Sequence, residues 1–431
     1  MQQPSLKREL GLFHATTIGV GLILGAGIYV LIGEASATSG NAVWLAFFIS
    51  AVVSLLTGFS YAELSSMYPK DAAEYTYTDK AFGRGLAFFI GYFVLLSAII
   101  SAAVVAIGFA GYFASLFKLD GLIYIAIAII IAFSILNYRS IKESAWANVI
   151  FTGLEMLGLF IIIGLGIGHF GSVDYIEMPV GIDGVFKSAA LVFFAFLGFE
   201  SVVKLSEECK NPRKTIPLAL LLSIGITTVL YILVAIAAVS ILDWQTLAES
   251  KAPLADVAAT VLGNNAFIAL SIIALFSTGN TVLISLIAGS RTLYGIGENY
   301  KLLKPFHKVH KKRHTPHIAI WTVMIFSIIF TFIEDIGLIA ELTNFTLFVT
   351  FAVINLAVIA LRYKYPNEQR KFKVPLNIGK MPILAFVGFL SCLFFISQLS
   401  NEIIVGGLGL VALGAIFYLV VIRYEYQNKG K

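Results

Sequence analysis

Residues 19–28 read GVGLILGAGI, and residues 193–201 read FFAFLGFES. Both stretches lie inside long apolar segments, and both carry glycine near the middle of the segment. Glycine has no Cβ atom, so it weakens a helix and lets a ligand or another backbone approach closely. The two stretches therefore predict a pair of interrupted membrane helices. The alternative is that these glycines only allow neighbouring helices to pack closely.

The rest of the chain is also strongly apolar. Of its 431 residues, 58% are hydrophobic and 13% are charged, and the mean hydropathy is +0.89. A soluble domain carries about 25% charged residues, so this composition excludes an ordinary soluble enzyme, a disordered protein and a fibrous protein. A helix that crosses a bilayer needs roughly 20 mostly apolar residues. We therefore expect an all-α integral membrane protein with many spans.

Twelve apolar stretches are long enough to be membrane spans or nearly so. We expect these spans at residues 11–33, 42–66, 86–117, 121–138, 145–169, 185–205, 216–242, 265–297, 317–333, 336–361, 380–399 and 403–423. The two glycine-containing stretches fall in the first and sixth spans. This spacing predicts two five-span halves, at 11–169 and 185–361, which insert in opposite orientations as an inverted repeat. Residues 380–423 add two C-terminal helices. Transporters use such inverted repeats, so we expect residues 1–431 to form one transporter domain.

The distribution of charge predicts the orientation in the membrane. The formal net charge is +5, and Lys and Arg fall mainly in every second loop, as they do in cytoplasmic loops. We therefore expect a multi-pass protein of the cytoplasmic membrane with both termini inside. The basic run at 301–317 has nucleic-acid binding as its alternative, but the apolar context favours a loop beside the bilayer. We expect no nucleic acid and no required protein partner.

Four motifs make the chain similar to the amino acid–polyamine–organocation superfamily of permeases, which share the LeuT-type fold. The motifs are GAGIY at 25–29, YAEL at 61–64, FAFLGFES at 194–201 and SEECKNPRKTIP at 206–217, of which the last is the most specific. One departure is Ala73-Glu74, where many relatives have a pair of small residues. The resemblance implies a secondary transporter that works by alternating access. Such a carrier needs no cofactor, only a proton or sodium gradient.

An amino-acid carrier must hold a carboxylate and an ammonium group at low dielectric, where an unpaired charge costs several kcal/mol. A broken helix supplies both kinds of partner. Free N–H groups at the start of its outer half favour an anion, and its unwound carbonyl groups accept an ammonium. The resemblance implies the same division. The predicted substrate-binding residues are Ile23, Leu24, Gly25, Ala26, Gly27, Tyr29, Phe194, Ala195, Leu197 and Gly198.

The side chains expected in this pocket belong to Ala26, Tyr29, Phe194 and Leu197. None of them is acidic or basic, which favours a neutral amino acid over arginine, lysine or a polyamine. The resemblance implies that Phe194 is an aromatic gate over the substrate. The alternative is an ordinary core aromatic, because the chain has 35 phenylalanines.

Glu155 lies in the middle of the fifth expected span. A carboxyl group at membrane depth is costly and is by default a functional hypothesis. Many relatives carry a lysine at about this position, close to span 1. We expect Glu155 to load and release a proton, which makes proton coupling the leading hypothesis. The alternative is a permanently protonated Glu155 that hydrogen bonds to the backbone of span 1 or span 8.

Other polar residues are candidates for coupling or gating. Glu200 follows the span 6 break, where it either gates together with Gly21 or pairs with Lys204 at i+4. In sodium-coupled members of this fold, polar groups of span 8 bind the ion, and interhelical hydrogen bonding is the alternative. The residues of this possible ion site are Ser277, Thr278, Asn280 and Thr281. Glu63, Glu207 and Glu208 are expected to form ion pairs with Arg or Lys at the inner face.

Several alternatives remain open at this stage. Within the carrier class they are a sodium-coupled symporter, an amino-acid exchanger and a polyamine or amine permease. A membrane-embedded enzyme would need a nucleophile, base or metal set that converges at one depth, and a channel would need a continuous polar lining. The sequence has isolated carboxylates and no metal-binding spacing of its two cysteines, Cys209 and Cys392. We therefore expect no enzymatic activity.

Overall fold

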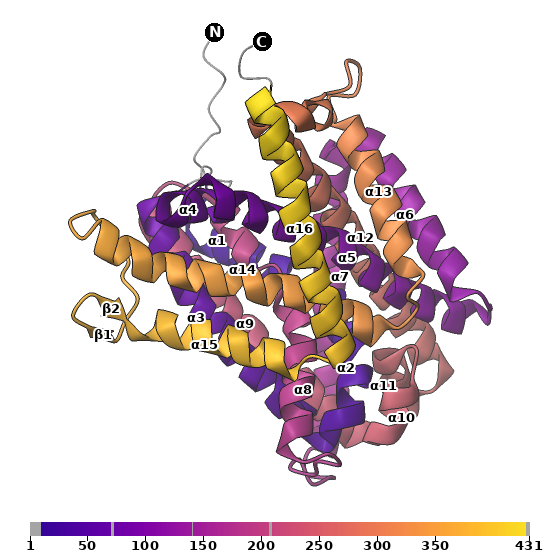
Figure 1. Ribbon diagram of the computed structural model, residues 1–431. Helices are drawn as coiled ribbons and strands as arrows, with labels where there is room; N and C mark the ends of the chain where they lie inside the picture. The colour runs from indigo at the N-terminus through magenta and orange to yellow at the C-terminus, as the bar shows by residue number, and fades with distance from the viewer. Residues whose placement is uncertain (1–9, 70–72, 140, 207–208, 428–431) are drawn as a thin grey trace.

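The computed structural model describes residues 10–69, 73–139, 141–206 and 209–427, and for 141–150, 204 and 299 it describes the backbone alone. These residues form helices and one short hairpin (Figure 1). In the described part of the chain, nine helical segments are long and apolar enough to cross a membrane. The chain is therefore a multi-pass membrane protein, as the composition predicts.

The helices of the first part of the chain are α1 (Leu12–Ile23), α2 (Ala26–Ser39), η1 (Gly40–Ala42), α3 (Val43–Met67), α4 (Ala73–Phe82), α5 (Arg84–Phe117), α6 (Leu122–Arg139), α7 (Ile141–Gly166) and η2 (Ile167–His169). The second part has α8 (Ile182–Val192), η3 (Phe193–Phe196), η4 (Phe199–Leu205), α9 (Pro212–Ile241), α10 (Trp244–Glu249), α11 (Pro253–Leu262), α12 (Asn264–Asn299), η5 (Lys301–His307), α13 (His317–Thr331) and α14 (Ile336–Lys364). The hairpin of β1 (Asn377–Ile378) and β2 (Met381–Pro382) then precedes α15 (Ile383–Gln398) and α16 (Asn401–Gln427).

Both glycine-containing stretches are interrupted, as the sequence predicts. Helix α1 ends at Ile23 and α2 begins at Ala26, so Leu24 and Gly25 lie between them. In the second stretch α8 passes into the tighter helix η3, and η4 follows after Leu197 and Gly198. Gly198 has φ +118°, a left-handed conformation that residues with a Cβ atom rarely adopt. This residue therefore separates η3 from η4.

Helices α4, α10 and α11 lie between the expected membrane spans. Each has at most 10 residues, so none of them forms a long apolar stretch in the sequence. In α4 the residues Ala73, Tyr77 and Ala81 recur every fourth position and are buried. This spacing is that of a short amphipathic helix. The connection between the second and third expected spans therefore contains a short helix at 73–82.

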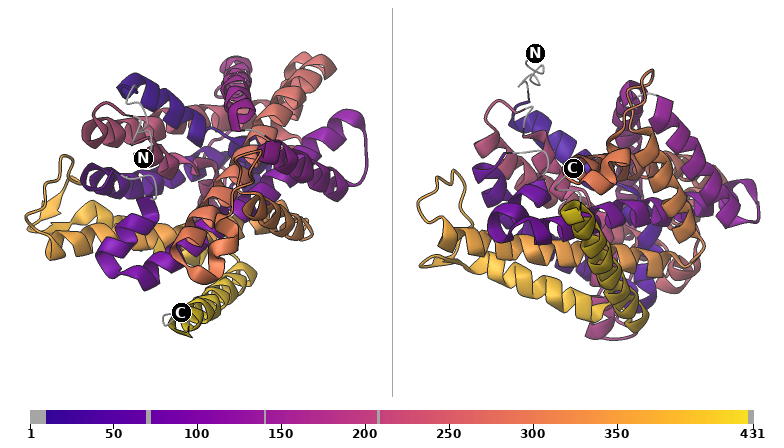
Figure 2. Two further views of the ribbon diagram at one scale, coloured as in Figure 1. Left: turned by 90° about the horizontal axis from the view of Figure 1, so that it is seen from above. Right: turned by 45° about the horizontal axis from the view of Figure 1, so that its top comes forward.

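The helices pack around the two interrupted stretches. Helix α3 packs along α9, α5 packs along α12, and α2 contacts α8 and η3. Helices α14 and α15 lie side by side and run in opposite directions, whereas α16 lies at the edge of the bundle (Figure 2). Helix α4 and the α12–α13 connection lie at the upper end of Figure 1, and α10 and α11 lie at the lower end. The interrupted stretches thus meet inside the molecule.

Candidate functional site

A cavity of about 110 Å³ lies where the two interrupted stretches meet. One side of the cavity is formed by residues 21–27 and the other by η3, η4 and the residues between them. Helix α5 contributes Ser97 and Ser101, and α12 contributes Thr281 and Ser285. All of the predicted substrate-binding residues except Tyr29 line this cavity, and so do Gly21 and Glu200. The fold therefore brings the two predicted halves of the site together.

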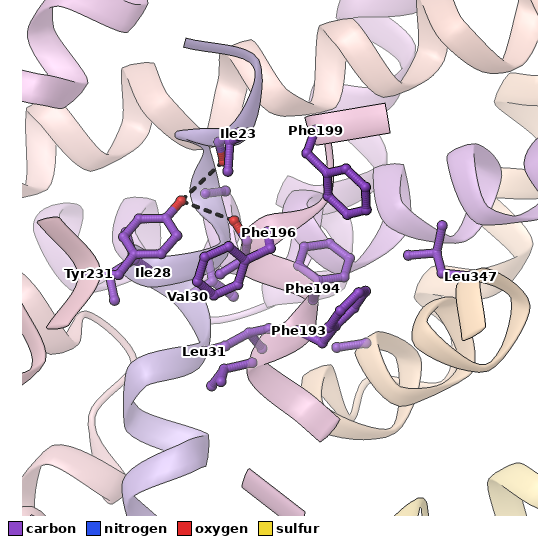
Figure 3. Close-up of a cluster of buried hydrophobic side chains, with 14 of the residues drawn as sticks. Ile23, Ile28, Val30, Leu31, Phe193, Phe194, Phe196, Phe199, Tyr231 and Leu347 are labelled. Atoms are coloured by element: carbon purple, nitrogen blue, oxygen red, sulfur yellow. Dashed lines mark hydrogen bonds between the residues drawn. The ribbon is translucent and has the colours of Figure 1, made fainter. Parts of the chain in front are cut away.

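The side chains around this cavity are mostly apolar or hydroxyl-bearing. Phe194 and Leu197 contribute the larger apolar groups, and Phe194 is 3% exposed. Phe194 lies among other aromatic side chains of η3 and η4 (Figure 3). Among the described residues, Glu200 is the one carboxylate in the lining of the cavity. Its Oε2 atom accepts a hydrogen bond of 2.8 Å from the Gly198 N–H group, so it stabilises the break in its own segment.

Close backbone approach explains the glycines on either side of the cavity. A Cβ atom on Gly27 would overlap the backbone of Ala195, so this glycine lets α2 touch η3 directly. A Cβ atom on Gly198 would overlap the carbonyl oxygen of Leu22. Gly21 packs in the same way against Thr152 of α7, whose Cγ2 atom would lie 2.8 Å from such a Cβ. The glycines thus set how closely the two stretches and α7 pack.

Tyr231 of α9 satisfies carbonyl groups of both interrupted stretches. Its hydroxyl group lies 3.0 Å from the Ile23 carbonyl oxygen and 3.0 Å from the Ala195 carbonyl oxygen, so the two acceptors share one hydrogen (Figure 3). A break inside a membrane frees backbone groups that must find partners within the protein. Sequence reasoning does not find Tyr231, because one tyrosine in an apolar helix has the pattern of an ordinary core residue.

Two more polar side chains support the breaks. The amide group of Asn344 in α14 donates to the carbonyl oxygens of Ala190 and Leu191, at 2.7 and 2.8 Å. The Ala26 N–H group donates to Oγ1 of Thr281 over 3.2 Å. The sequence predicts that this N–H group is free for a substrate anion. In this conformation it already has a partner, so an anion would have to replace Thr281.

Tyr29 is turned away from the cavity and towards α7. Its hydroxyl group donates to the backbone carbonyl oxygen of Glu155 over 2.8 Å, and its side chain is fully buried. The expectation that Tyr29 is a pocket side chain therefore does not describe this conformation. The reason is geometric: Tyr29 lies three residues after Ala26, about 300° around a helix of 3.6 residues per turn. That rotation directs the ring to a different neighbour.

Glu155 is 1% exposed and lies between α7 and α12. Its Oε1 atom accepts a hydrogen bond of 2.6 Å from the Ser277 hydroxyl group. Within the described part of the chain, its Oε2 atom has no hydrogen-bond partner. The carboxyl group is therefore buried, and one of its two oxygen atoms has no hydrogen-bond partner among the described residues.

A short chain of hydrogen bonds joins Glu155 to the break between α1 and α2. Ser277 contacts Glu155 through its hydroxyl group, and its backbone carbonyl oxygen accepts a hydrogen bond from Thr281 over 3.1 Å. Thr281 in turn accepts from Ala26. Of the other residues in the possible ion site, Thr278 donates to Ala274 in its own helix, and Asn280 is buried. The structure thus brings Thr281 to the break and Ser277 to Glu155.

Glu63 of α3 forms the ion pairs that its position predicts. Its carboxylate lies 2.5 Å from Nη2 of Arg362 and 3.2 Å from Nε of Arg370, and all three side chains are buried. The Val374 N–H group also donates to Glu63 over 2.8 Å. The predicted ion pairs of Glu207 and Glu208, and the side chain of Lys204, lie outside the described residues. Across the described ranges, acids, His and Cys do not gather into a group able to hold a metal ion.

A multi-pass helical protein with two interrupted stretches around a small central cavity has the architecture of a membrane permease. Residues 10–422 match the family model described as amino acid permease. The chain belongs to this family, which confirms the resemblance to the amino acid–polyamine–organocation superfamily.

Three relatives illustrate the range of the family. The chain is 31% identical to the branched-chain amino acid permease BcaP of Bacillus subtilis (strain 168), over 98% of this chain and 94% of the relative. It is 30% identical to the methylthioribose transporter of the same organism, over 99% of this chain and 96% of the relative. It is 28% identical to the vacuolar cationic amino acid transporter 2 of Arabidopsis thaliana, over 84% of this chain and 61% of the relative.

Proposed function

We propose that this protein is a secondary active transporter that carries neutral amino acids across the cytoplasmic membrane by alternating access, coupled to protons. The observation that carries the proposal is the cavity between the two interrupted stretches. Backbone groups of both stretches line it, so a zwitterion finds donors and acceptors there without a charged partner. The energy comes from an ion gradient, and no cofactor takes part.

The proposed topology has twelve crossings, with α1 and α2 counted as one span and α8, η3 and η4 as another. Two five-span halves related by an inverted repeat precede α15 and α16. The packing supports this arrangement, because α3 pairs with α9 and α5 pairs with α12. The members of each pair hold the same place in the two halves. Both termini then lie in the cytoplasm.

The composition of the cavity supports a neutral substrate. Its one carboxylate, Glu200, already accepts a hydrogen bond from Gly198. A cationic substrate would need an acidic partner for its side chain at low dielectric. Phe194 and Leu197 instead offer apolar surface. The name of the branched-chain amino acid permease BcaP, a relative along nearly the whole chain, agrees with this preference.

Glu155 is the proposed proton-coupling residue. Its carboxyl group is buried, and Ser277 and Thr281 join it to the break that forms the substrate cavity. Movement at the break would displace Thr281 from Ala26 and thereby change the surroundings of the carboxyl group. Protonation of Glu155 and substrate binding would then influence each other.

The test is uptake of labelled leucine into proteoliposomes under an inward proton gradient, an inward sodium gradient or no gradient. We expect the proton gradient to drive accumulation in the wild type, and Glu155→Gln to abolish that drive while exchange of leucine continues. The matched control is Glu341→Gln. Glu341 is a partly buried carboxylate of α14 that lies outside this network and accepts a hydrogen bond from the Ser400 N–H group. Accumulation driven by sodium alone would contradict proton coupling, and the absence of leucine transport would contradict the substrate class.

A further inference from the structure

A second cavity, of about 520 Å³, adjoins the first on the side of α4. The two cavities share Val94, Ser201, Ile284, Ala288 and Thr292 as wall residues. The second is also lined by Glu74 and Tyr75 of α4 and by Arg291 and Glu298 of α12. It therefore extends the first cavity towards the end of the molecule where α4 lies, which the proposed topology places inside the cell.

Arg291 is the unusual residue of this second cavity. Its side chain is partly buried, and its Nη2 atom is buried without a hydrogen-bond partner among the described residues. The ion pairs found in the described ranges join Glu63 to Arg362 and Arg370 and do not include Arg291. A guanidinium nitrogen that is buried without a hydrogen-bond partner is costly, and such an exception asks for an explanation.

The two carboxylates described in the lining of this cavity do not supply that partner. Glu74 is 5% exposed and accepts a hydrogen bond of 3.3 Å from the Tyr61 hydroxyl group. Glu298 is exposed and lies seven residues beyond Arg291 in α12, about 10 Å further along the helix. Among the described residues, the cavity thus has one cation in its wall and two acids towards α4 and the end of α12.

We propose that Arg291 binds the carboxylate of the substrate in the inner cavity, as a second station between the central site and the cytoplasm. The planar guanidinium group matches a carboxylate in two parallel hydrogen bonds. Glu74 and Glu298 then face the ammonium group of the same zwitterion. The inference rests on the proposed function and adds an inner site that requires a carboxylate.

The spacing along α12 separates this station from the break between α1 and α2, although the central cavity itself extends as far as Thr292 beside Arg291. Thr281 contacts Ala26 at the break, and Arg291 lies ten residues further on. Ten residues of α-helix span about 15 Å, which is more than the length of a small amino acid. One substrate molecule therefore cannot contact both positions, and the two sites are occupied in sequence.

The test is leucine exchange in proteoliposomes of defined orientation, with half-saturation measured separately at the inner and outer faces. For Arg291→Gln we expect the inner half-saturating concentration to rise about tenfold or more, the range for loss of a hydrogen bond to a charged group. The half-saturating concentration at the outer face should stay unchanged. Arg313→Gln is the control, because Arg313 is exposed in the α12–α13 connection on the same side. Arg291→Lys keeps the charge without the planar fork, so we expect a smaller rise.

Comparison of the half-saturating concentrations at the inner and outer faces distinguishes a lost contact from a shifted conformational equilibrium. A shift alone would raise one half-saturating concentration and lower the other. A second probe is 4-methylpentanoate, which is leucine without its amino group. Inside the vesicles it should inhibit exchange by the wild type and by Arg291→Lys, but not by Arg291→Gln.

The inference would be overturned if Arg291→Gln and Arg313→Gln had the same half-saturating leucine concentration at the inner face. The inference would also be overturned if 4-methylpentanoate inside the vesicles did not inhibit exchange by the wild type. This result decides the question even if Arg291→Gln does not fold. In both cases the wild type still exchanges leucine, so the proposed function stands. A wild type that exchanges no amino acid overturns both proposals.

Discussion

At the scale of single residues, the breaks depend on a few positions with strict steric demands. Gly198 has φ +118°, and a Cβ atom there would overlap the carbonyl oxygen of Leu22. Gly225, in the middle of α9, has open space around the place of a Cβ atom. The same substitution should therefore have opposite effects at these two glycines.

We expect Gly198→Ala to lower the free energy of unfolding by about 1–3 kcal/mol from the left-handed backbone alone, and further from the overlap with Leu22. Gly225→Ala should be neutral or slightly stabilising, because alanine restricts the unfolded chain and favours the helix. Thermal unfolding of the purified variants in detergent measures both effects. Equal melting temperatures for the two variants would contradict the steric argument.

At the scale of elements, a buried ion-pair cluster ties α3 to the chain that follows α14. Glu63 contacts Arg362 at the end of α14 and Arg370 in the connection to β1. The Arg362 guanidinium group also donates to Asn377 of β1. One carboxylate of α3 thus holds the whole connection between α14 and α15.

Removal of one partner leaves a buried charge, so Glu63→Gln should destabilise the protein by about 3–5 kcal/mol. The double variant Glu63→Gln with Arg362→Met should lose less free energy of unfolding than the two single variants lose in total. The reason is that it removes both charges of this ion pair. Chemical denaturation of the four proteins gives this coupling energy. Additive effects would mean that the ion pair does not contribute to stability.

The helices and breaks could largely be predicted from the sequence, because long apolar segments and mid-membrane glycines leave a clear pattern. The residues that support the breaks could not be predicted from the sequence. Tyr231 and Asn344 are single polar residues in apolar helices, and their partners lie far away in the chain. The direction of Tyr29 and the cavity around Arg291 depend on helix rotation and packing. Spacing along one helix shows only that Tyr29 points away from the face of Ala26, and the neighbour that it meets is set by how the helices pack.

At the scale of the whole molecule, the central cavity continues into the larger one beside α4. Thr292 borders both cavities, whereas Thr346 of α14 is fully buried in the core. The native cysteines, Cys209 and Cys392, are buried. A cysteine introduced at one of the two threonines therefore reports which side of the membrane reaches it.

We expect Thr292→Cys to react with a membrane-impermeant thiol reagent applied to the cytoplasmic face, and to react much more slowly from the outside. Thr346→Cys should stay unlabelled from either face. The rate of labelling, followed by mass spectrometry of the intact protein, checks this. Faster labelling of Thr292→Cys from outside would reverse the proposed orientation of the two cavities.

The hydroxyl group of Tyr231 has a consequence for movement. It has one hydrogen and two acceptors at equal distance, the carbonyl oxygens of Ile23 and Ala195. If α1 swings away from α9, the hydrogen can pass wholly to Ala195, and if η3 moves instead it can pass to Ile23. Each motion then loses half of a shared bond rather than a whole one. In the proposed alternating-access cycle, Tyr231 would therefore lower the barrier between conformations at the junction of the two interrupted stretches.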